Sequence, residues 1–197
     1  MNSKSPNISQ EKQVHDATAA GFTCLKPFQT ARLWVSSWRG TLEDKSARRK
    51  LEADLLAMLS EPVLRHLPER VQLDDGPDAI KTWIADRDAS AAIFLVQDNA
   101  GLAGLMFLFR PVDTPKTEPL HLGYLFGETS WGKGYASEMV IGLVEALTDG
   151  PVMTLQGGVD VNNPASARVL EKAGFVRDDA LCSDEIDIFS RQVGSAQ

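Results

Sequence analysis

Residues 127–135 read Gly-Glu-Thr-Ser-Trp-Gly-Lys-Gly-Tyr and lie between an apolar run, 120–126, and a segment with helical spacing of apolar residues, 136–147. The run predicts a strand and the segment predicts a helix. Backbone amides at the first turn of a helix have no intrahelical partner and carry the positive end of the helix dipole. Because glycines let the backbone approach a ligand closely, the stretch predicts a binding loop for a phosphate or a pyrophosphate.

The loop has four interpretations. Residues 127–133 fit the nucleotide-binding pattern G-x-x-x-x-G-K, but Gly134 stands where Ser or Thr is needed to hold Mg²⁺, and the glycines at 157–158 interrupt the later apolar run. The dinucleotide pattern G-x-G-x-x-G fails at Ser137. The remaining interpretations are a pyrophosphate loop for coenzyme A and a turn without a ligand.

Upstream of the loop, the pattern predicts two helices and four strands, the last of them the run at 120–126. Residues 98–101, Asp-Asn-Ala-Gly, lie between two apolar runs and are typical of a hairpin turn. We expect a strand at 33–38, a helix at about 42–59, a helix opening at Pro77, hairpin strands at 91–96 and 102–109, and a proline-marked loop at 111–119.

Downstream of the loop, residues 149–151, Asp-Gly-Pro, end the helix, and a strand begins at 152–155. Asn163 before Pro164 predicts the N-cap of a further helix, which Gly174 ends. Alternation at 184–189 predicts a last strand. The order of elements predicts a mixed α/β (α+β) sandwich, formed by one domain over 21–197 after a mobile tail at 1–20.

Composition excludes several classes of protein. The chain has 197 residues, and its hydrophobic (43%) and charged (24%) fractions are ordinary for a soluble globular protein. No apolar run reaches the roughly 18 residues that span a bilayer, and no secretory signal precedes the domain, so we expect a cytoplasmic protein without a membrane partner. The net charge of −7 argues against a nucleic-acid partner and favours cationic partners such as amines.

Metal and disulfide chemistry are not indicated. Cys24 and Cys182 lie far apart and outside any Cys/His cluster, so we interpret both as small, partly buried thiols. The histidines, His15, His66 and His121, lack the spacing of metal ligands, and we expect no metal site.

A second motif follows one helix and one strand after the loop. Residues 163–175 read Asn-Pro-Ala-Ser-Ala-Arg-Val-Leu-Glu-Lys-Ala-Gly-Phe. The two motifs together resemble the GCN5-related N-acetyltransferase (GNAT) superfamily, and most closely its ribosomal-protein alanine N-acetyltransferase (RimJ/RimL-like) branch, with W-G-x-G-x-A and N-x-x-S-x-x-x-x-x-K-x-G-F. Residues 30–33, Thr-Ala-Arg-Leu, look like the opening T-x-R-L of this family, so the resemblance covers about 30–191.

The resemblance implies a GNAT-like mixed, mostly antiparallel sheet flanked by helices, with splayed fourth and fifth strands, and acetyl-CoA as cosubstrate. The pantetheine arm would lie in the splay. The residues implied to bind it are the backbone of Leu125 and Phe126, the amides of Trp131, Gly132, Lys133, Gly134, Tyr135 and Ala136, the side chain of Asn163, and Lys172 near the adenosine. Asn163 is otherwise a plain N-cap, and Lys172 a solvated helix end.

The chain departs from the family where catalysis is concerned. Thr129 replaces a common Arg or Gln before the loop, and residues 168–170 contain no tyrosine to act as general acid. Ser166 is then the candidate proton donor or holder of the sulfur, and is otherwise a hydroxyl that bonds the backbone. His121 replaces the Glu of an E-I-G-Y pattern and is the candidate base or proton relay, or else a sheet histidine. Glu128 is a second candidate base.

The predicted reaction is acetyl transfer to a primary amine by direct attack in a ternary complex. The acceptor, a small molecule or a protein N-terminus, is expected between the first two helices and the fourth strand, near Trp34, Trp38 and Trp83. A monomer and a homodimer both fit. The competing hypotheses are a coenzyme A-binding module without catalysis and a P-loop nucleotidase.

Overall fold

The computed structural model describes residues 25–110 and 118–195. Within them, one sheet of eight strands has the order β1-β2-β3-β4-β5-β6-β8-β7, and only β5 and β6 pair in parallel. The strands are β1 (Phe28–Gln29), β2 (Trp34–Ser37), β3 (Ala92–Asp98), β4 (Gly101–Phe109), β5 (Leu120–Phe126), β6 (Met153–Asp160), β7 (Val176–Arg177) and β8 (Ile186–Val193).

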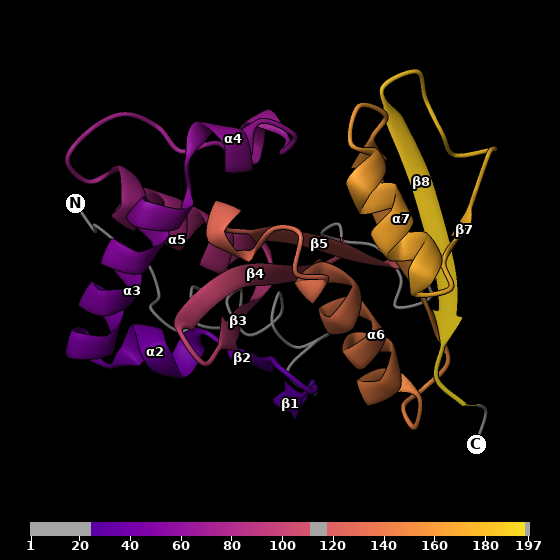
Figure 1. Cartoon of the computed structure of the whole chain (residues 1–197), viewed down its shortest axis with the longest axis horizontal. Coiled ribbons are helices and arrows are strands. Elements are labelled where there is room, and N and C mark those ends of the chain that lie inside the picture. Colours follow the sequence, from indigo (N-terminus) through magenta and orange to yellow (C-terminus); the bar gives the residue numbers. More distant parts are fainter. Residues whose placement is uncertain (1–24, 111–117, 196–197) are drawn as a thin grey trace, which may run out of the picture.

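Helices flank this sheet, and α2, α3 and α5 gather at the left of Figure 1, whereas α6 and α7 lie toward the right. The helices are α2 (Arg39–Glu43), α3 (Lys45–Met58), α4 (Glu61–Leu64), α5 (Ala79–Ser90), α6 (Tyr135–Leu147) and α7 (Pro164–Lys172), with short 3-10 helices η1 (Glu69–Val71) and η2 (Glu128–Ser130). The mixed, mostly antiparallel sheet with flanking helices confirms the predicted fold class.

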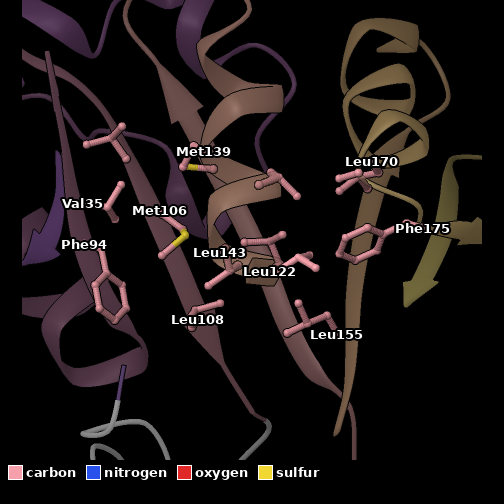
Figure 2. Packing of buried hydrophobic residues seen from close by; sticks show 14 of the residues in the cluster. Val35, Phe94, Met106, Leu108, Leu122, Met139, Leu143, Leu155, Leu170 and Phe175 are labelled. Carbon is pink, nitrogen blue, oxygen red and sulfur yellow. The ribbon is translucent and has the colours of Figure 1, made fainter. Parts of the chain in front are cut away.

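The core consists of two buried clusters. The α6/α7 cluster includes Met139, Leu143, Leu170 and Phe175, and the α3/α5 cluster includes Leu51, Leu55, Trp83 and Ile84. Successive strand residues point to opposite faces, so neighbouring residues of β3 and β4 contribute to different clusters. Figure 2 shows the α6/α7 cluster, where side chains of both helices lie over those of the sheet. The sheet therefore separates two apolar layers.

The helix predicted at 42–59 is wrong as a single element, because α2 and α3 meet at Asp44. Its carboxylate accepts hydrogen bonds from the amides of Ser46 (2.9 Å) and Ala47 (2.7 Å) and so caps a new helix. The backbone of Asp44 is extended, which interrupts the helical path. The helix expected to open at Pro77 begins at Ala79.

Two strands also differ from their predicted limits. The glycines at 157–158 do not interrupt β6, since every residue from Met153 to Asp160 is paired with β8. β8 begins at Ile186 and continues to Val193, four residues beyond the predicted end. The tail at 1–20, most of the proline-marked loop, Cys24 and His15 lie outside the described residues.

The parallel junction between β5 and β6 is short. Only Leu120 with Leu155 and His121 with Gln156 are paired across it. Beyond these pairs β5 stays on β4 as far as Phe126, and β6 stays on β8 as far as Asp160. The two strand ends, 122–126 and 157–160, are therefore the facing edges of a gap in the sheet, as the predicted splay requires.

Candidate functional site

The loop after β5 enters α6 through two glycines in the left-handed region. Gly132 has a φ of 71° and Gly134 a φ of 79°, values that residues with a side chain rarely adopt. Gly134 is also the N-cap of α6 and has no side chain with which to cap the first-turn amides. Residues 131–134 are exposed. The loop therefore presents backbone amides at the positive end of a 13-residue helix, an arrangement that suits an anion.

Trp131 joins this loop to the end of β5. Its indole Nε1 donates a hydrogen bond to the carbonyl oxygen of Phe126 at 2.7 Å, and the residue remains 50% exposed. The bond fixes the ring beside the loop and occupies the Phe126 carbonyl. A large, half-exposed ring in this place offers an apolar surface to a ligand.

Backbone groups of β5 point alternately toward β4 and toward the gap. The amide of Gly127 donates to the carbonyl of Ala103 at 3.0 Å, so by alternation Leu125 also faces β4. Tyr124 and Phe126 then direct their backbone groups into the gap. Of the two backbone contacts predicted, at Leu125 and Phe126, the strand geometry favours Phe126.

Helix α7 begins near the gap with a capped first turn. The side-chain oxygen of Asn163 accepts a hydrogen bond from the Ser166 amide at 3.2 Å, so Asn163 is an N-cap, and its NH₂ group takes no part in the cap. The Tyr124 hydroxyl donates to the Ser166 carbonyl at 3.3 Å, which brings β5 and α7 together. Lys172 is exposed in the last turn of α7.

Tyr124 is a site residue that the sequence analysis did not select. Burial raises the pKa of its hydroxyl to about 12, with the hydrogen bond to Ser166 acting in the opposite direction, so the phenol is protonated at neutral pH. Its ring packs against the α6/α7 cluster. Alternation along β5, which places Tyr124 on the face of Leu122, is the signal that could have drawn attention to it.

Leu170 packs where α7 meets β6. Its side chain is 1% exposed, and its Cδ1 lies 2.9 Å from the point that a Cβ on Gly157 would occupy. Gly157 therefore allows α7 to lie close to the edge of the gap. Residues 168–170 carry no hydroxyl group. Where α7 approaches the gap, the hydroxyl groups are those of Ser166 and Tyr124.

His121 lies on the other face of β5, by alternation the face of Leu125, which belongs to the α3/α5 cluster. Its imidazole is stacked on Phe109 of β4, with ring centroids 5.1 Å apart and an interplanar angle of 16°. His121 is half-buried and forms one of the two pairs at the parallel junction. The two predicted catalytic residues, His121 and Ser166, are thus on opposite faces of the sheet, where the gap begins.

The segment around α4 contacts the residues that follow β5 and the end of β6. At its start, the Ser60 hydroxyl donates to the carboxylate of Glu128, just after β5, at 2.5 Å. Beyond its end, His66 Nδ1 lies 3.2 Å from Asp160 Oδ2 at the end of β6. Hydrogen bonds from the Asn162 amide and from His66 hold the pKa of Asp160 below its usual range. We call residues 60–66 the α4 bridge.

The three tryptophans expected near the acceptor have different environments. Trp38 and Trp83 are buried, and their indole N–H groups donate to Asp88 and to the Val71 carbonyl, both at 2.9 Å, so they are core residues. Trp34 is 45% exposed on β2. A polar pocket of about 240 Å³ opens between η1 and α5, lined by Glu69, Gln72, Asp74, Ala79, Trp83, Asp86 and Arg87.

The described residues contain neither a metal-ligating cluster nor a membrane-spanning helix. Among residues 25–110 and 118–195, no three His, Cys, Asp or Glu side chains are grouped so that they could hold a metal ion. In the same part of the chain, no helix has both the length and the apolar character needed to cross a bilayer. Cys182 is a free, half-buried thiol.

Comparison with known proteins identifies one family. Residues 47–176 match the family described as the acetyltransferase (GNAT) domain. No curated protein sequence matches the chain.

Solved structures share the fold at low sequence identity. RimL, a ribosomal L7/L12 α-N-protein acetyltransferase in complex with coenzyme A, is 16% identical with a TM-score of 0.62, over 83% of this chain and 96% of that one. Spermidine N-acetyltransferase from Vibrio cholerae, in complex with CoA and spermine, is 14% identical with a TM-score of 0.60, over 82% and 96%. The microcin C7 self-immunity acetyltransferase MccE, with acetyl-CoA and AMP, is 15% identical with a TM-score of 0.61, over 83% and 93%.

Proposed function

The chain belongs to the GNAT family of acetyltransferases, and from this premise we propose that it transfers an acetyl group from acetyl-CoA to a primary amine by direct attack in a ternary complex. The observation that carries the proposal is the gap between β5 and β6, which opens beside the uncapped start of α6. An extended, amide-bearing arm with a diphosphate at one end is complementary to a strand edge followed by an anion-binding loop.

The residues proposed to hold the cosubstrate follow from this complementarity. The outward carbonyl of Tyr124 and the outward amide of Phe126 would pair with the pantetheine arm, since the Phe126 carbonyl is bonded to Trp131, and the amides of 131–136 would hold the pyrophosphate. The Asn163 NH₂ group would contact a pantetheine amide or an ordered water. The exposed Lys172 would interact with the adenosine end. Acetyl-CoA, when bound, supplies an acetyl thioester that a neutral amine can attack.

The catalytic roles are assigned to groups at the start of the gap. His121 would take the proton that the ammonium form of the acceptor must lose before attack. The amide of Tyr124, which faces the gap nearer to His121, would stabilise the negative charge that develops on the carbonyl oxygen. Ser166, on the α7 side, would donate a proton or a hydrogen bond to the sulfur of coenzyme A, which leaves as a thiolate when the carbon–sulfur bond of the thioester breaks. No cysteine among the described residues lies at the gap, which supports direct attack over a covalent acetyl-enzyme.

The acceptor is a primary amine of a small molecule or of a protein N-terminus. Structural neighbours include enzymes named for each class, RimL for a protein and spermidine N-acetyltransferase for a small molecule. The motifs at 131–136 and 163–175 support placing the chain in the RimJ/RimL-like branch. We propose a monomer or homodimer that binds neither nucleic acid nor membrane, in keeping with the net charge of −7.

The test is calorimetric titration of the purified protein with acetyl-CoA, CoA and Mg-ATP, beside a Gly134→Glu variant. Gly134 requires a positive φ and lies at the loop, so Glu adds strain and a negative charge where the pyrophosphate is expected. We expect micromolar binding of both CoA species that the variant loses. Gly76→Glu is the matched control, because Gly76 also has a positive φ, and a Cβ there would meet no atom within 4 Å.

Each outcome discriminates among the hypotheses. Binding followed by thiol release on addition of amines or N-terminal peptides supports the enzyme. Binding without thiol release with any amine would instead favour a coenzyme A-binding module. The observations that motivate this hypothesis are the absence of a tyrosine at 168–170 and the presence of His121 in place of a glutamate. Magnesium-dependent binding of ATP without binding of CoA would overturn the proposal in favour of a nucleotidase.

A further inference from the structure

The segment before β2 is bound to the first turn of α6 through one carboxylate. Glu138 Oε1 accepts hydrogen bonds from the Thr30 hydroxyl (2.6 Å) and the Arg32 amide (2.8 Å). Its Oε2 accepts from Arg32 Nε (2.7 Å) and lies 2.5 Å from Arg32 Nη2. The Glu138 side chain is only 17% exposed, whereas that of Arg32 is 49% exposed. Thus the positive partner faces outward beside the loop.

A carboxylate in this position has two opposed effects. In the first turn it stabilises the helix, because it complements the positive end of the dipole. The same negative charge repels any anion that binds to the same amides. Burial by itself would raise the pKa of Glu138, but the hydrogen bonds from Thr30 and Arg32 lower it overall, so the carboxylate is ionised at neutral pH. A cation that compensates Glu138 therefore favours the binding of a diphosphate at the loop.

Arg32 also packs on the loop itself. Its Cζ lies 4.7 Å from the ring centroid of Tyr135, and Lys133 Nζ lies 5.6 Å from the same centroid, so the ring is close to two cations. Arg32 Nη2 is 3.7 Å from the point that a Cβ on Gly134 would occupy. These contacts place one guanidinium against both the N-cap and the first residue of α6.

We propose that Arg32 is a positioning residue for coenzyme A, which neutralises Glu138 and holds Tyr135 so that the amides of 131–136 present a net positive potential to the diphosphate. The inference rests on the proposed function, since it concerns the same loop. It explains what the opening motif at 30–33 does, because Thr30 and Arg32 share one partner on α6.

The test compares variants that remove one charge of the Arg32–Glu138 pair with a double variant that removes both. Arg32→Gln leaves Glu138 uncompensated, and we expect its Kd for acetyl-CoA to rise by about fivefold to tenfold. Glu138→Gln keeps an oxygen acceptor for Thr30 and removes the repulsion, so it should bind at least as tightly as the wild type. In the double variant the Kd should return to within about twofold of the wild-type value, because both charges are gone.

The chain offers a matched control pair on α3. Arg48 and Glu52 are 3.1 Å apart with exposed fractions of 41% and 16%, close to those of Arg32 and Glu138. Arg48→Gln makes the same change in net charge away from the loop and should leave the Kd unchanged. The Kd ratio of Arg32→Gln to wild type should also shrink as salt rises, because screening weakens the repulsion.

The failures of the two proposals are distinguishable by calorimetry with CoA and acetyl-CoA, with the thermal midpoint recorded for every variant. Absence of binding to the wild type overturns both. Wild-type binding that Arg32→Gln leaves intact overturns only the inference. A double variant that binds as poorly as Arg32→Gln also overturns the inference, because a purely structural effect would then account for the loss. An Arg48→Gln variant that is equally weakened overturns it too, because the loss would then be a global effect of charge.

Discussion

At the scale of single residues, Tyr124 and His121 lie on opposite faces of the same strand and carry different chemistry. Tyr124 is a buried phenol bound to the first turn of α7, and His121 is an imidazole stacked on Phe109. The strand pattern therefore places a phenol that donates a hydrogen bond on the α7 side and an imidazole on the α3/α5 side. Each can be tested without disturbing the other.

Tyr124 should make stability fall at high pH. Burial raises the pKa of its hydroxyl from the ordinary 10.0 to about 12, so the folded state holds the proton more tightly than the unfolded chain does. Its contribution is complete below pH 10 and is lost as pH rises toward 12. Between pH 8 and pH 11, the free energy of unfolding measured in urea should fall by about 1.4 kcal/mol more for the wild type than for Tyr124→Phe. Equal losses would contradict the raised pKa.

His121 should matter for turnover and little for cosubstrate affinity. Replacement by Gln removes the proposed base, and we expect kcat to fall about 100-fold with the Kd for acetyl-CoA within twofold. Glu128→Gln serves as the comparison, because Glu128 is exposed and bonded to Ser60, and it should retain most of the rate. The opposite result, with turnover lost only in Glu128→Gln, would assign the base to Glu128.

At the scale of elements, the packing of α7 on β6 depends on which of two adjacent glycines is changed. A Cβ on Gly157 would lie 2.9 Å from Leu170 Cδ1, whereas one on Gly158 would make ordinary contacts at 3.4 Å and 3.5 Å with Ile186 and Ile188. We expect Gly157→Ala to lower the free energy of unfolding by about 1–3 kcal/mol through overpacking.

Gly158→Ala is the matched control and should change the free energy of unfolding by less than about 0.5 kcal/mol. Urea unfolding of both variants measures the difference. Similar values for the two would mean that α7 is free to move away from the edge of the gap.

The elements also show what sequence patterns can predict. Long, strongly periodic elements, such as β5 and α6, lie where their patterns indicate, and the N-cap Asn163 was readable from its neighbour Pro164. The break at Asp44 was not predicted. It is set by the Asp44 carboxylate, which accepts hydrogen bonds from the amides of Ser46 and Ala47 and so begins a new helix. The short strands β1 and β7 have two residues each, too few to show an alternating pattern, and they are recognised only by their pairing with β2 and β8.

The candidate site likewise has one part that the sequence predicts and another that it does not. The loop at 127–135 is local in sequence, so its glycines and its helix were predictable. Tyr124 and Arg32 act through residues 42 and 106 positions away, and only the folded chain brings them to Ser166 and Glu138. Contacts at such separations are set by tertiary packing, so no periodicity or motif could assign them.

At the scale of the whole molecule, the sheet consists of two parts joined by two residue pairs. The α6/α7 cluster spans the junction, with residues from β2 to β5 on one side and from β6 and β8 on the other. A ligand in the gap would add a further connection. At a concentration 100 times its Kd, acetyl-CoA should raise the free energy of unfolding by about 2.7 kcal/mol.

This stabilisation is measured by unfolding in urea with and without acetyl-CoA. Gly134→Glu should show no increase at the same concentration, while Gly76→Glu should respond as the wild type does. A full increase in Gly134→Glu would place the ligand somewhere other than the loop.

The α4 bridge has a consequence for how two substrates affect each other. It contacts Glu128 after β5 and Asp160 at the end of β6, so any change in the separation of these strand ends alters one or both contacts. A ligand that changes the separation of the strand ends and a ligand that contacts the α4 bridge would then be energetically coupled. Such coupling is reciprocal, so the factor by which acetyl-CoA changes the affinity for an amine is the factor by which that amine changes the affinity for acetyl-CoA.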